Sequence, residues 1–134
     1  MKRRTRRFSL LELMIVLLIL GLLAALAVPN LMKKADKAKY KTGELQVKLL
    51  SNAIKDYYLD MDEYPDTLED LVTDTGDTKW DGPYLDPPKI PLDPWGEPFR
   101  YDFPGRHGQF DLSSLGADKS PGGDKYNADI NNWE

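Results

Sequence analysis

Three aspartates near the C-terminus could bind a metal ion. Asp118, Asp124 and Asp129 lie in a segment that is rich in glycine and other turn-forming residues. Carboxylate oxygens and free main-chain carbonyls suit calcium, which accepts about six to eight oxygen ligands in irregular geometry. The spacing does not follow the EF-hand pattern, and aspartates are also ordinary turn residues. The residues alone therefore leave two alternatives, a calcium site and a turn-rich loop without metal.

Glu12 is the second residue with a clear chemical consequence, because it interrupts an apolar run. Residues 13–28 are all apolar or glycine, and upstream of them the run continues to Phe8 with only Ser9 and Glu12 as polar positions. A carboxylate within a membrane helix costs about 2.5 to 3.5 kcal/mol on insertion scales. Either a positive partner such as an α-amine compensates this charge, or Glu12 lies close enough to the lipid headgroups to be hydrated.

No arrangement of residues typical of catalysis is apparent. His107 is the only histidine, and we interpret it as a hydrogen-bonding residue of a Pro-Gly-Arg-His-Gly turn. Ser113 and Ser114 lack the context of a nucleophilic serine, and no phosphate-binding glycine loop is present. The sequence has no cysteine, which excludes a disulfide framework and a thiolate zinc site. We therefore expect a protein that is not an enzyme.

The apolar run has the length of a membrane-spanning helix. About 21 residues at about 1.5 Å per residue match the roughly 30 Å hydrocarbon core of a bilayer. A cleavable secretory signal is the alternative, since the small residues 24–27 could form a cleavage site. Against that alternative, the run is long for a signal and contains the acidic Glu12.

The charge distribution gives this segment an orientation. Five of the 18 basic residues fall within the first seven positions, where there is no acid. By the positive-inside rule, a basic segment that precedes an apolar run stays in the cytoplasm. The apolar run then crosses the membrane, and the residues after it are exported. Without those five positive charges the formal net charge falls from -4 to -9. The rest of the chain is therefore acidic, which argues against nucleic-acid binding.

After Pro29 the sequence becomes amphipathic. Apolar residues recur at steps of three and four residues, and charged residues lie between them, which predicts a one-sided helix. The predicted apolar stripe consists of Leu45, Leu49, Leu50, Ala53, Ile54, Tyr57, Tyr58 and Met61. One helix from about Ser9 to Asp62 would then contain both halves, with Pro29 either kinking it or marking the end of the spanning segment.

The rest of the chain predicts small elements packed on this helix. Tyr64 and Pro65 end the helix, and Asp66 or Thr67 can cap a short one after it. Residues 73–98 predict an ordered loop anchored by aromatic residues, Trp80 and Trp95 among them. Residues 99–103 and 109–115 predict two short antiparallel strands joined by a turn. Residues 116–134 are polar and rich in turns, and Trp133 is a further expected packing anchor.

Several motifs together resemble one protein family. The run FSLLE at residues 8–12, followed by the apolar stretch and VPN at 28–30, resembles the processing signal of type IV pilins and pseudopilins. Downstream blocks narrow the resemblance to the major pseudopilins of type II secretion, over essentially the whole chain from Phe8. These blocks are ADKAK at 35–39, YP at 64–65, DPWG at 93–96, PGRHG at 104–108, LGAD at 115–118 and NADI at 127–130.

The resemblance implies a role for the N-terminal residues. In this family a prepilin peptidase cuts just before the residue that matches Phe8, which is then N-methylated. The carboxylate that matches Glu12 recruits the N-terminus of a neighbouring subunit, and the segment around Pro29 melts or kinks in the assembled filament. Arg7 departs from the family, because the peptidase normally requires glycine at that position.

The resemblance also implies a calcium site in the C-terminal loop. The matching ligands are the carboxylates of Asp118 and Asp129 and the main-chain carbonyls of Leu115 and Ser120. Asp124 lies where the loop varies in length among relatives, and it is the expected third carboxylate.

The expected fold is α+β and type IV pilin-like. A long N-terminal helix, with its hydrophobic half protruding, packs on a small antiparallel sheet with a C-terminal calcium loop. The expected organisation is a basic leader peptide at 1–7, a transmembrane and filament-core helix at 8–29, and a periplasmic globular domain at 30–134. The expected location is the bacterial inner membrane, with a single pass.

The function implied by the resemblance is that of a structural subunit. Copies of the chain would polymerise into a periplasmic pseudopilus that drives the export of folded proteins across the outer membrane. The implied partners are minor pseudopilins, an inner-membrane platform protein, an assembly ATPase and the prepilin peptidase. A subunit of a type IV pilus and a solitary membrane-anchored calcium-binding module are the alternatives.

Overall fold

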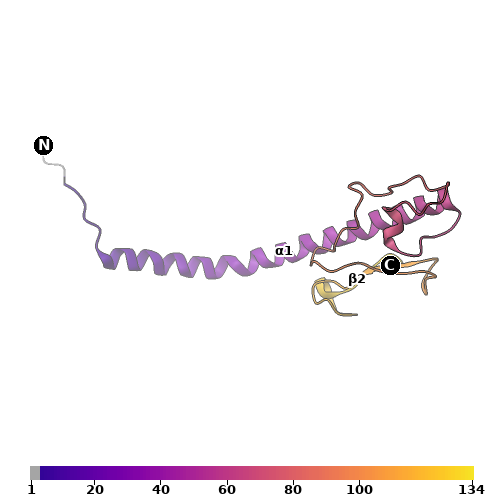
Figure 1. The fold of residues 1–134 in the computed structure, drawn as a ribbon. Helices are drawn as coiled ribbons and strands as arrows, with labels where there is room; N and C mark the ends of the chain where they lie inside the picture. Colours follow the sequence, from indigo (N-terminus) through magenta and orange to yellow (C-terminus); the bar gives the residue numbers. More distant parts are fainter. Residues whose placement is uncertain (1–3) are drawn as a thin grey trace. The chain divides into compact units, whose positions relative to one another are not determined.

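The computed structural model describes residues 4–134, so Met1, Lys2 and Arg3 of the predicted leader lie outside the described residues. The chain divides between Ala35 and Asp36 into two compact units, each of which is described by itself. The elements in chain order are α1 (Leu10–Met61), η1 (Leu68–Leu71), β1 (Arg100–Asp102), β2 (Asp111–Ser114), η2 (Lys125–Asn127) and β3 (Ile130–Asn131) (Figure 1). The predicted domain bounds at 7 and 29 stay a prediction.

The long helix α1 is continuous through Pro29. It has 52 residues and ends one residue short of the predicted Asp62. Proline lacks an N–H and removes one bond of the helical ladder, yet the helical backbone does not break at this position. The predicted single helix is therefore confirmed, and a local opening at Pro29 is not present in this subunit.

The hydrophobic core lies in the unit Asp36–Glu134. One face of α1 supplies Val47, Leu50, Ala53, Ile54, Tyr57 and Met61, and the other side of the core consists of Leu68, Leu71, Phe99, Phe110, Leu112 and Ile130. Leu50 and Ile54 are the most deeply buried residues of the helix, at 1% and 0% exposed. Each such side chain contributes about 1.5 to 3 kcal/mol by leaving water.

Three residues of the predicted apolar stripe are not in the core. Leu45, Leu49 and Tyr58 are 55%, 63% and 40% exposed, whereas Val47 is buried. Successive residues turn by about 100° around a helix, so Leu49 lies about a quarter turn or more from Leu50. The prediction for these three residues was wrong because an apolar stripe read from the sequence is broader than the face that the sheet and loops cover.

The sheet has three strands in the order β1-β2-β3 and is antiparallel throughout. Tyr101 pairs with Leu112, and Ser114 pairs with Ile130. The two predicted strands are therefore confirmed. The third strand, β3, was not predicted, because it has two residues and lies in a polar segment whose pattern indicates turns.

The predicted aromatic anchors hold the irregular segments in place. The indole N–H of Trp80 donates to the carbonyl of Asp70 at 2.9 Å. Trp95 contacts Tyr40 of α1 edge to face, with ring centroids 6.4 Å apart. After α1, the predicted short helix is the 3-10 turn η1, whose start is held by the backbone N–H of Thr67 donating to the carboxylate of Asp70 at 3.0 Å.

Candidate functional site

The predicted processing residues precede the long helix. Arg7 and Phe8 lie in a segment without regular structure, and α1 begins at Leu10. Phe8 is 84% exposed. The Arg7–Phe8 peptide bond is therefore accessible in the isolated subunit, as cleavage by a peptidase requires.

Glu12 belongs to the first turn of α1 and takes part in a helix cap. Its backbone N–H donates to the hydroxyl of Ser9 at 3.2 Å, which satisfies one of the free N–H groups at a helix start. A carboxylate in this turn also interacts favourably with the positive end of the helix dipole. The cap formed by Ser9 was not predicted, although the spacing Ser-x-x-Glu is the signature of a capping box.

Residues 13–28 in the first half of α1 present an uninterrupted apolar surface. Every large apolar side chain between Leu10 and Met32 is exposed, and none of its most apolar 18-residue window is buried. Among the described residues, α1 is the one helix long and apolar enough to cross a membrane, a test that a signal sequence also passes. Such a surface in water would be an extreme hydrophobic patch, so this half of α1 is suited to a membrane or a partner helix.

The aspartate-rich loop at residues 115–129 is tightly folded by its own backbone. The N–H of Ala117 donates to the carbonyl of Tyr126 at 3.0 Å. Gly116 has a φ of +75°, and a Cβ there would lie 2.6 Å from the carbonyl oxygen of Ala128. Glycine is therefore required at Gly116 for conformational and for steric reasons.

The predicted calcium ligands differ in their surroundings. Asp118 is exposed, and its carboxylate accepts the N–H of Ser120 at 3.1 Å. One carboxylate oxygen of Asp129 accepts the N–H of Gly122 at 3.1 Å, while the other, Oδ1, is buried and has no hydrogen-bond partner among residues 4–134. Asp124 is exposed and precedes η2.

These residues fit a hard cation in chemistry, although their carboxylates do not converge. Within residues 4–134 no three acidic or histidine side chains are grouped so that they could hold a metal ion. The buried free oxygen of Asp129 nevertheless lacks the positive partner that such an atom requires. The main-chain carbonyls of Leu115 and Ser120 accept no loop or turn hydrogen bond in the described part of the chain. The donor set consists of oxygen atoms alone, as calcium prefers.

A buried carboxylate that the sequence analysis did not single out supports the start of this loop. Asp93 is 5% exposed and accepts hydrogen bonds from the hydroxyl of Ser114 at 2.7 Å and from the N–H groups of Trp95 and Glu97 at 3.0 and 2.8 Å. Ser114 ends β2 and immediately precedes Leu115. The spacing Asp-Pro-Trp-Gly indicates a turn, but burial of its aspartate depends on the distant β2.

His107 takes part in a second carboxylate cluster. Its ring Nδ1 and backbone N–H contact the carboxylate of Asp111 at 2.9 and 3.1 Å, and the N–H of Arg106 donates to the same carboxylate at 3.0 Å. Desolvation opposes ionisation of Asp111, but the hydrogen bonds from His107 and Arg106 outweigh it and lower the pKa of Asp111 below its usual value. His107 therefore acts as the loop hydrogen-bonding residue that the sequence predicts.

Comparisons with known proteins all match this chain to proteins of type II secretion. The family model described as type II secretion system protein G matches residues 30–133. The type II secretion system core protein G of Pseudomonas aeruginosa is 45% identical over 142 aligned residues, which cover 99% of this chain and 98% of that protein. The core protein G of Vibrio cholerae is 40% identical, with 98% and 93% covered. The crystal structure of the major pseudopilin from the type 2 secretion system of enterohaemorrhagic Escherichia coli superimposes with a TM-score of 0.61 at 32% identity, covering 78% of this chain and 91% of that one.

Proposed function

Since this chain belongs to the type II secretion system protein G family, the major pseudopilins, we propose that it polymerises into a periplasmic filament that drives the export of folded proteins across the outer membrane. The relatives are named as core proteins and a pseudopilin, which are structural subunits. The proposal assigns the energy source, an assembly ATPase, to a partner. Family membership favours secretion over the pilus and the solitary-module alternatives.

The observation that carries the proposal is the exposed apolar half of α1. Its side chains from Leu10 to Met32 have no partner within the described chain. In the membrane, lipid covers this surface. In the filament, the same surfaces of neighbouring copies cover one another, so one helix serves as both a membrane anchor and a filament core.

Glu12 supplies the specificity of assembly in this proposal. After cleavage before Phe8, the new α-amine lies four residues from Glu12 along the chain. A helical segment of that length separates the two groups by only about 6 Å along the axis, and the ammonium of one subunit pairs with Glu12 of the next. This pairing fixes the axial stagger between subunits.

Filament assembly tests the role of Glu12 directly. Glu12→Ala is expected to abolish sheared filaments in electron micrographs while leaving the amount of membrane-inserted protein unchanged. The control is Asp56→Ala, which removes an exposed carboxylate of α1 outside its apolar half. Normal filaments from Glu12→Ala would contradict the assigned role of Glu12.

Processing at the Arg7–Phe8 bond is a separate part of the proposal. Mass spectrometry of the membrane-extracted protein is expected to find Phe8 as the first residue, carrying one additional methyl group. Arg7→Gly is expected to raise the processed fraction, because glycine is the usual residue before the cut in this family. A mature protein that retains residues 4–7 would overturn this assignment.

Calcium held by the C-terminal loop is the cofactor in this proposal. Asp118 and Asp129 supply carboxylates, Leu115 and Ser120 supply main-chain carbonyls, and Asp124 supplies the third carboxylate. The ion would give order to a polar loop that has little apolar surface of its own. The free buried oxygen of Asp129 supports this assignment.

Thermal unfolding of the full chain in detergent tests the calcium site. Calcium is expected to raise the midpoint relative to a chelator, because a ligand that binds only the folded state stabilises it. Asp118→Asn and Asp129→Asn are expected to remove this difference. Asp86→Asn, an exposed aspartate outside the loop, is the control and is expected to retain it. An equal calcium response in all four proteins would exclude the proposed ligands.

The remaining partners follow from the proposed assembly. They are minor pseudopilins, an inner-membrane platform protein, the assembly ATPase and the prepilin peptidase. The proposed location is a single pass through the bacterial inner membrane with residues 30–134 in the periplasm. Co-purification of the cross-linked full chain with these components from membranes is the corresponding measurement.

A further inference from the structure

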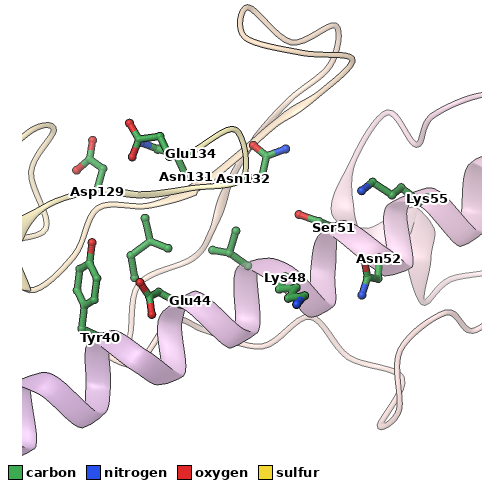
Figure 2. A pocket seen from close by; sticks show the side chains of 12 residues that line it. Tyr40, Glu44, Lys48, Ser51, Asn52, Lys55, Asp129, Asn131, Asn132 and Glu134 are labelled. Carbon is green, nitrogen blue, oxygen red and sulfur yellow. The ribbon is translucent and has the colours of Figure 1, made fainter.

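Two adjoining hollows follow one face of α1 within the unit Asp36–Glu134. The first has a volume of about 480 Å³ and lies between α1 and the C-terminal segment (Figure 2). The second has a volume of about 390 Å³ and extends toward the turn at His107. Both are lined by Ser51, Lys55 and Asn132. We call the two hollows together the α1 trough, and these three residues are its centre.

Ser51 at the centre of the trough is buried without a partner. It is 8% exposed, and its hydroxyl makes no hydrogen bond within the described chain. A serine inside a helix ordinarily bonds the carbonyl four residues before it or faces water, and Ser51 does neither. Because buried hydroxyl groups are almost always hydrogen-bonded, this one indicates that a polar group from outside the chain completes it.

Lys55 and Asn132 provide two further donors at the same place. Lys55 forms no ion pair within 4.0 Å among residues 4–134, and Figure 2 shows it extending along α1 toward Ser51. The amide nitrogen of Asn132 donates one hydrogen to the carbonyl of Phe110 at 3.2 Å, which leaves its second hydrogen free. A hydroxyl, an ammonium and an amide N–H together suit a carboxylate. Glu44, Asp129 and Glu134 also line the first hollow, so this preference is confined to the trough centre.

The wall of the trough opposite α1 contains β3, which pairs with β2 on one side and with no other strand of residues 4–134. Asp129, Ile130, Asn131 and Asn132 line the first hollow consecutively. Because side chains of a strand alternate between its two faces, a hollow lined by consecutive residues runs along the edge. The backbone N–H of Asn132 donates to Leu112 at 3.0 Å, so by alternation the N–H of Asn131 points away from β2. Such an edge offers a free backbone N–H to a polar group of another chain.

We propose that the α1 trough binds an exposed acidic loop of a second copy of this chain, with one carboxylate at Ser51, Lys55 and Asn132. This inference rests on the proposed function, since it assumes that copies assemble. The matching loop is residues 74–86, which has no helix or strand and folds into turns. The N–H groups of Gly76 and Lys79 donate to the carboxylates of Asp74 and Asp77 at 2.8 and 2.9 Å. The loop carries four exposed aspartates, Asp74, Asp77, Asp81 and Asp86, with Lys79 as its only basic residue.

The two surfaces are different patches of the same molecule. A contact between unlike patches is head-to-tail, and such contacts generate open filaments when they do not close into a ring. The trough contact therefore joins the unit Asp36–Glu134 of successive subunits, in addition to the contact of their apolar helices. The trough contributes the ammonium of Lys55 and the neighbouring copy contributes a carboxylate. Because the two surfaces differ, the contact gives the filament a direction.

Cysteine cross-linking between copies tests this contact, because the natural chain has no cysteine. One full-length chain carries Asn131→Cys, and a co-expressed chain carries a single cysteine in place of Asp74, Asp77, Asp81 or Asp86. Filaments are sheared from cells and oxidised. We expect a disulfide-linked dimer from at least one of the four pairs, since a disulfide requires Cα atoms within about 7 Å. Asn131→Cys paired with Lys41→Cys, outside the trough, is expected to give none.

Substitutions at the trough centre separate binding from folding. Lys55→Glu is expected to lower the dimer yield by roughly fivefold, and Lys41→Glu, a charge reversal elsewhere on α1, is expected to leave it unchanged. Ser51→Ala is expected to lower the dimer yield without lowering the thermal midpoint of the subunit, because the hydroxyl has no partner in the subunit to lose. A lower midpoint with unchanged dimer yield would assign Ser51 a purely structural role and overturn the proposal.

The amount of sedimenting filament distinguishes failure of the proposed function from failure of the trough contact. Normal filaments without a cross-link from any of the four pairs would overturn the trough contact and leave the proposed function intact. Absence of filaments from the natural chain would overturn the proposed function and the trough contact together. Filaments with a cross-link that Lys55→Glu does not reduce would exclude the assigned carboxylate position.

Discussion

The imidazole of His107 lies flat against the indole of Trp133, with ring centroids 4.0 Å apart and an interplanar angle of 5°. His107 belongs to the turn before β2, whereas Trp133 is the second-last residue of the chain. The stack therefore fastens the C-terminal segment to the sheet, beyond the short pairing of β2 with β3. It acts together with the hydrogen bonds of Asn132 to Phe110 and Leu112, which hold the same segment.

Removing the stack is expected to loosen the C-terminus. Trp133→Ala should lower the free energy of unfolding by about 1 kcal/mol, the usual value of an aromatic pair. Trp133→Phe keeps an aromatic ring and should lower it less. Urea unfolding of the full chain in detergent, followed by circular dichroism, measures both values. Equal losses for the two variants would show that stacking is not the source of the stability.

Truncating the core residue Ile54 is expected to be far more severe. Ile54 is 0% exposed, so Ile54→Ala leaves a cavity and should cost about 2 to 5 kcal/mol. Leu49→Ala is the matched control on the same helix, because Leu49 is 63% exposed and its truncation should change stability by less than about 0.5 kcal/mol. Similar losses for both variants would contradict the assigned core face of α1.

Acid is expected to destabilise the protein through Asp111. The pKa of Asp111 is lowered in the folded state, with desolvation outweighed by hydrogen bonds from His107 and Arg106. A lowered folded pKa contributes stability that is present above the unfolded value of about 3.9 and is lost as the pH falls through the folded pKa. The free energy of unfolding should therefore fall as the pH drops below about 4.

The variant Asp111→Asn tests this source of acid sensitivity. It should be less stable near neutral pH and should show a smaller further loss between about pH 4 and pH 2. Asp102→Asn, an exposed strand residue, should keep the natural pH profile. Thermal midpoints across this pH range make the comparison, and an unaltered profile in Asp111→Asn would place the acid sensitivity elsewhere.

Gly116 is expected to tolerate no side chain. Gly116→Ala combines a positive φ with a clash against the carbonyl of Ala128. Gly76 has a φ of +83° and no atom within 4 Å of the place that a Cβ would occupy, so Gly76→Ala carries the conformational cost alone. The thermal midpoint should therefore fall more for Gly116→Ala than for Gly76→Ala. Equal shifts would mean that the loop can move away from Gly116.

The hydroxyl of Ser114 is expected to be needed by the buried Asp93. Ser114→Ala removes the donor at 2.7 Å and leaves one carboxylate oxygen unsatisfied, which should cost about 1 to 3 kcal/mol. The adjacent Ser113 makes no side-chain hydrogen bond in the described part of the chain, so Ser113→Ala should have little effect. Chemical unfolding of the two variants decides between a specific hydrogen bond and a general intolerance of β2 to substitution.

Local patterns in the sequence were sufficient for the elements that depend on local physics. The apolar run and the periodicity after Pro29 predict α1, because backbone hydrogen bonds of a helix are formed within the segment itself. The alternating residues around Tyr101 predict β1. The basic start with its apolar run predicts a membrane anchor, and a helix of suitable length and composition is present there. Glu12 stands out in the sequence for the same reason, since the cost of its charge depends only on its apolar neighbours along the chain.

Tertiary structure alone decided the features that join distant residues. Ile130 becomes a strand residue because it pairs with Ser114. A strand of two residues inside a polar segment has no sequence pattern that would predict this pairing. Leu49 is exposed and Asp93 is buried because packing partners from other segments determine burial. The trough centre joins Ser51 to Asn132, 81 positions further along the chain. Burial and cavity shape depend on which remote surfaces meet, and that information is not contained in the spacing of residues along the chain.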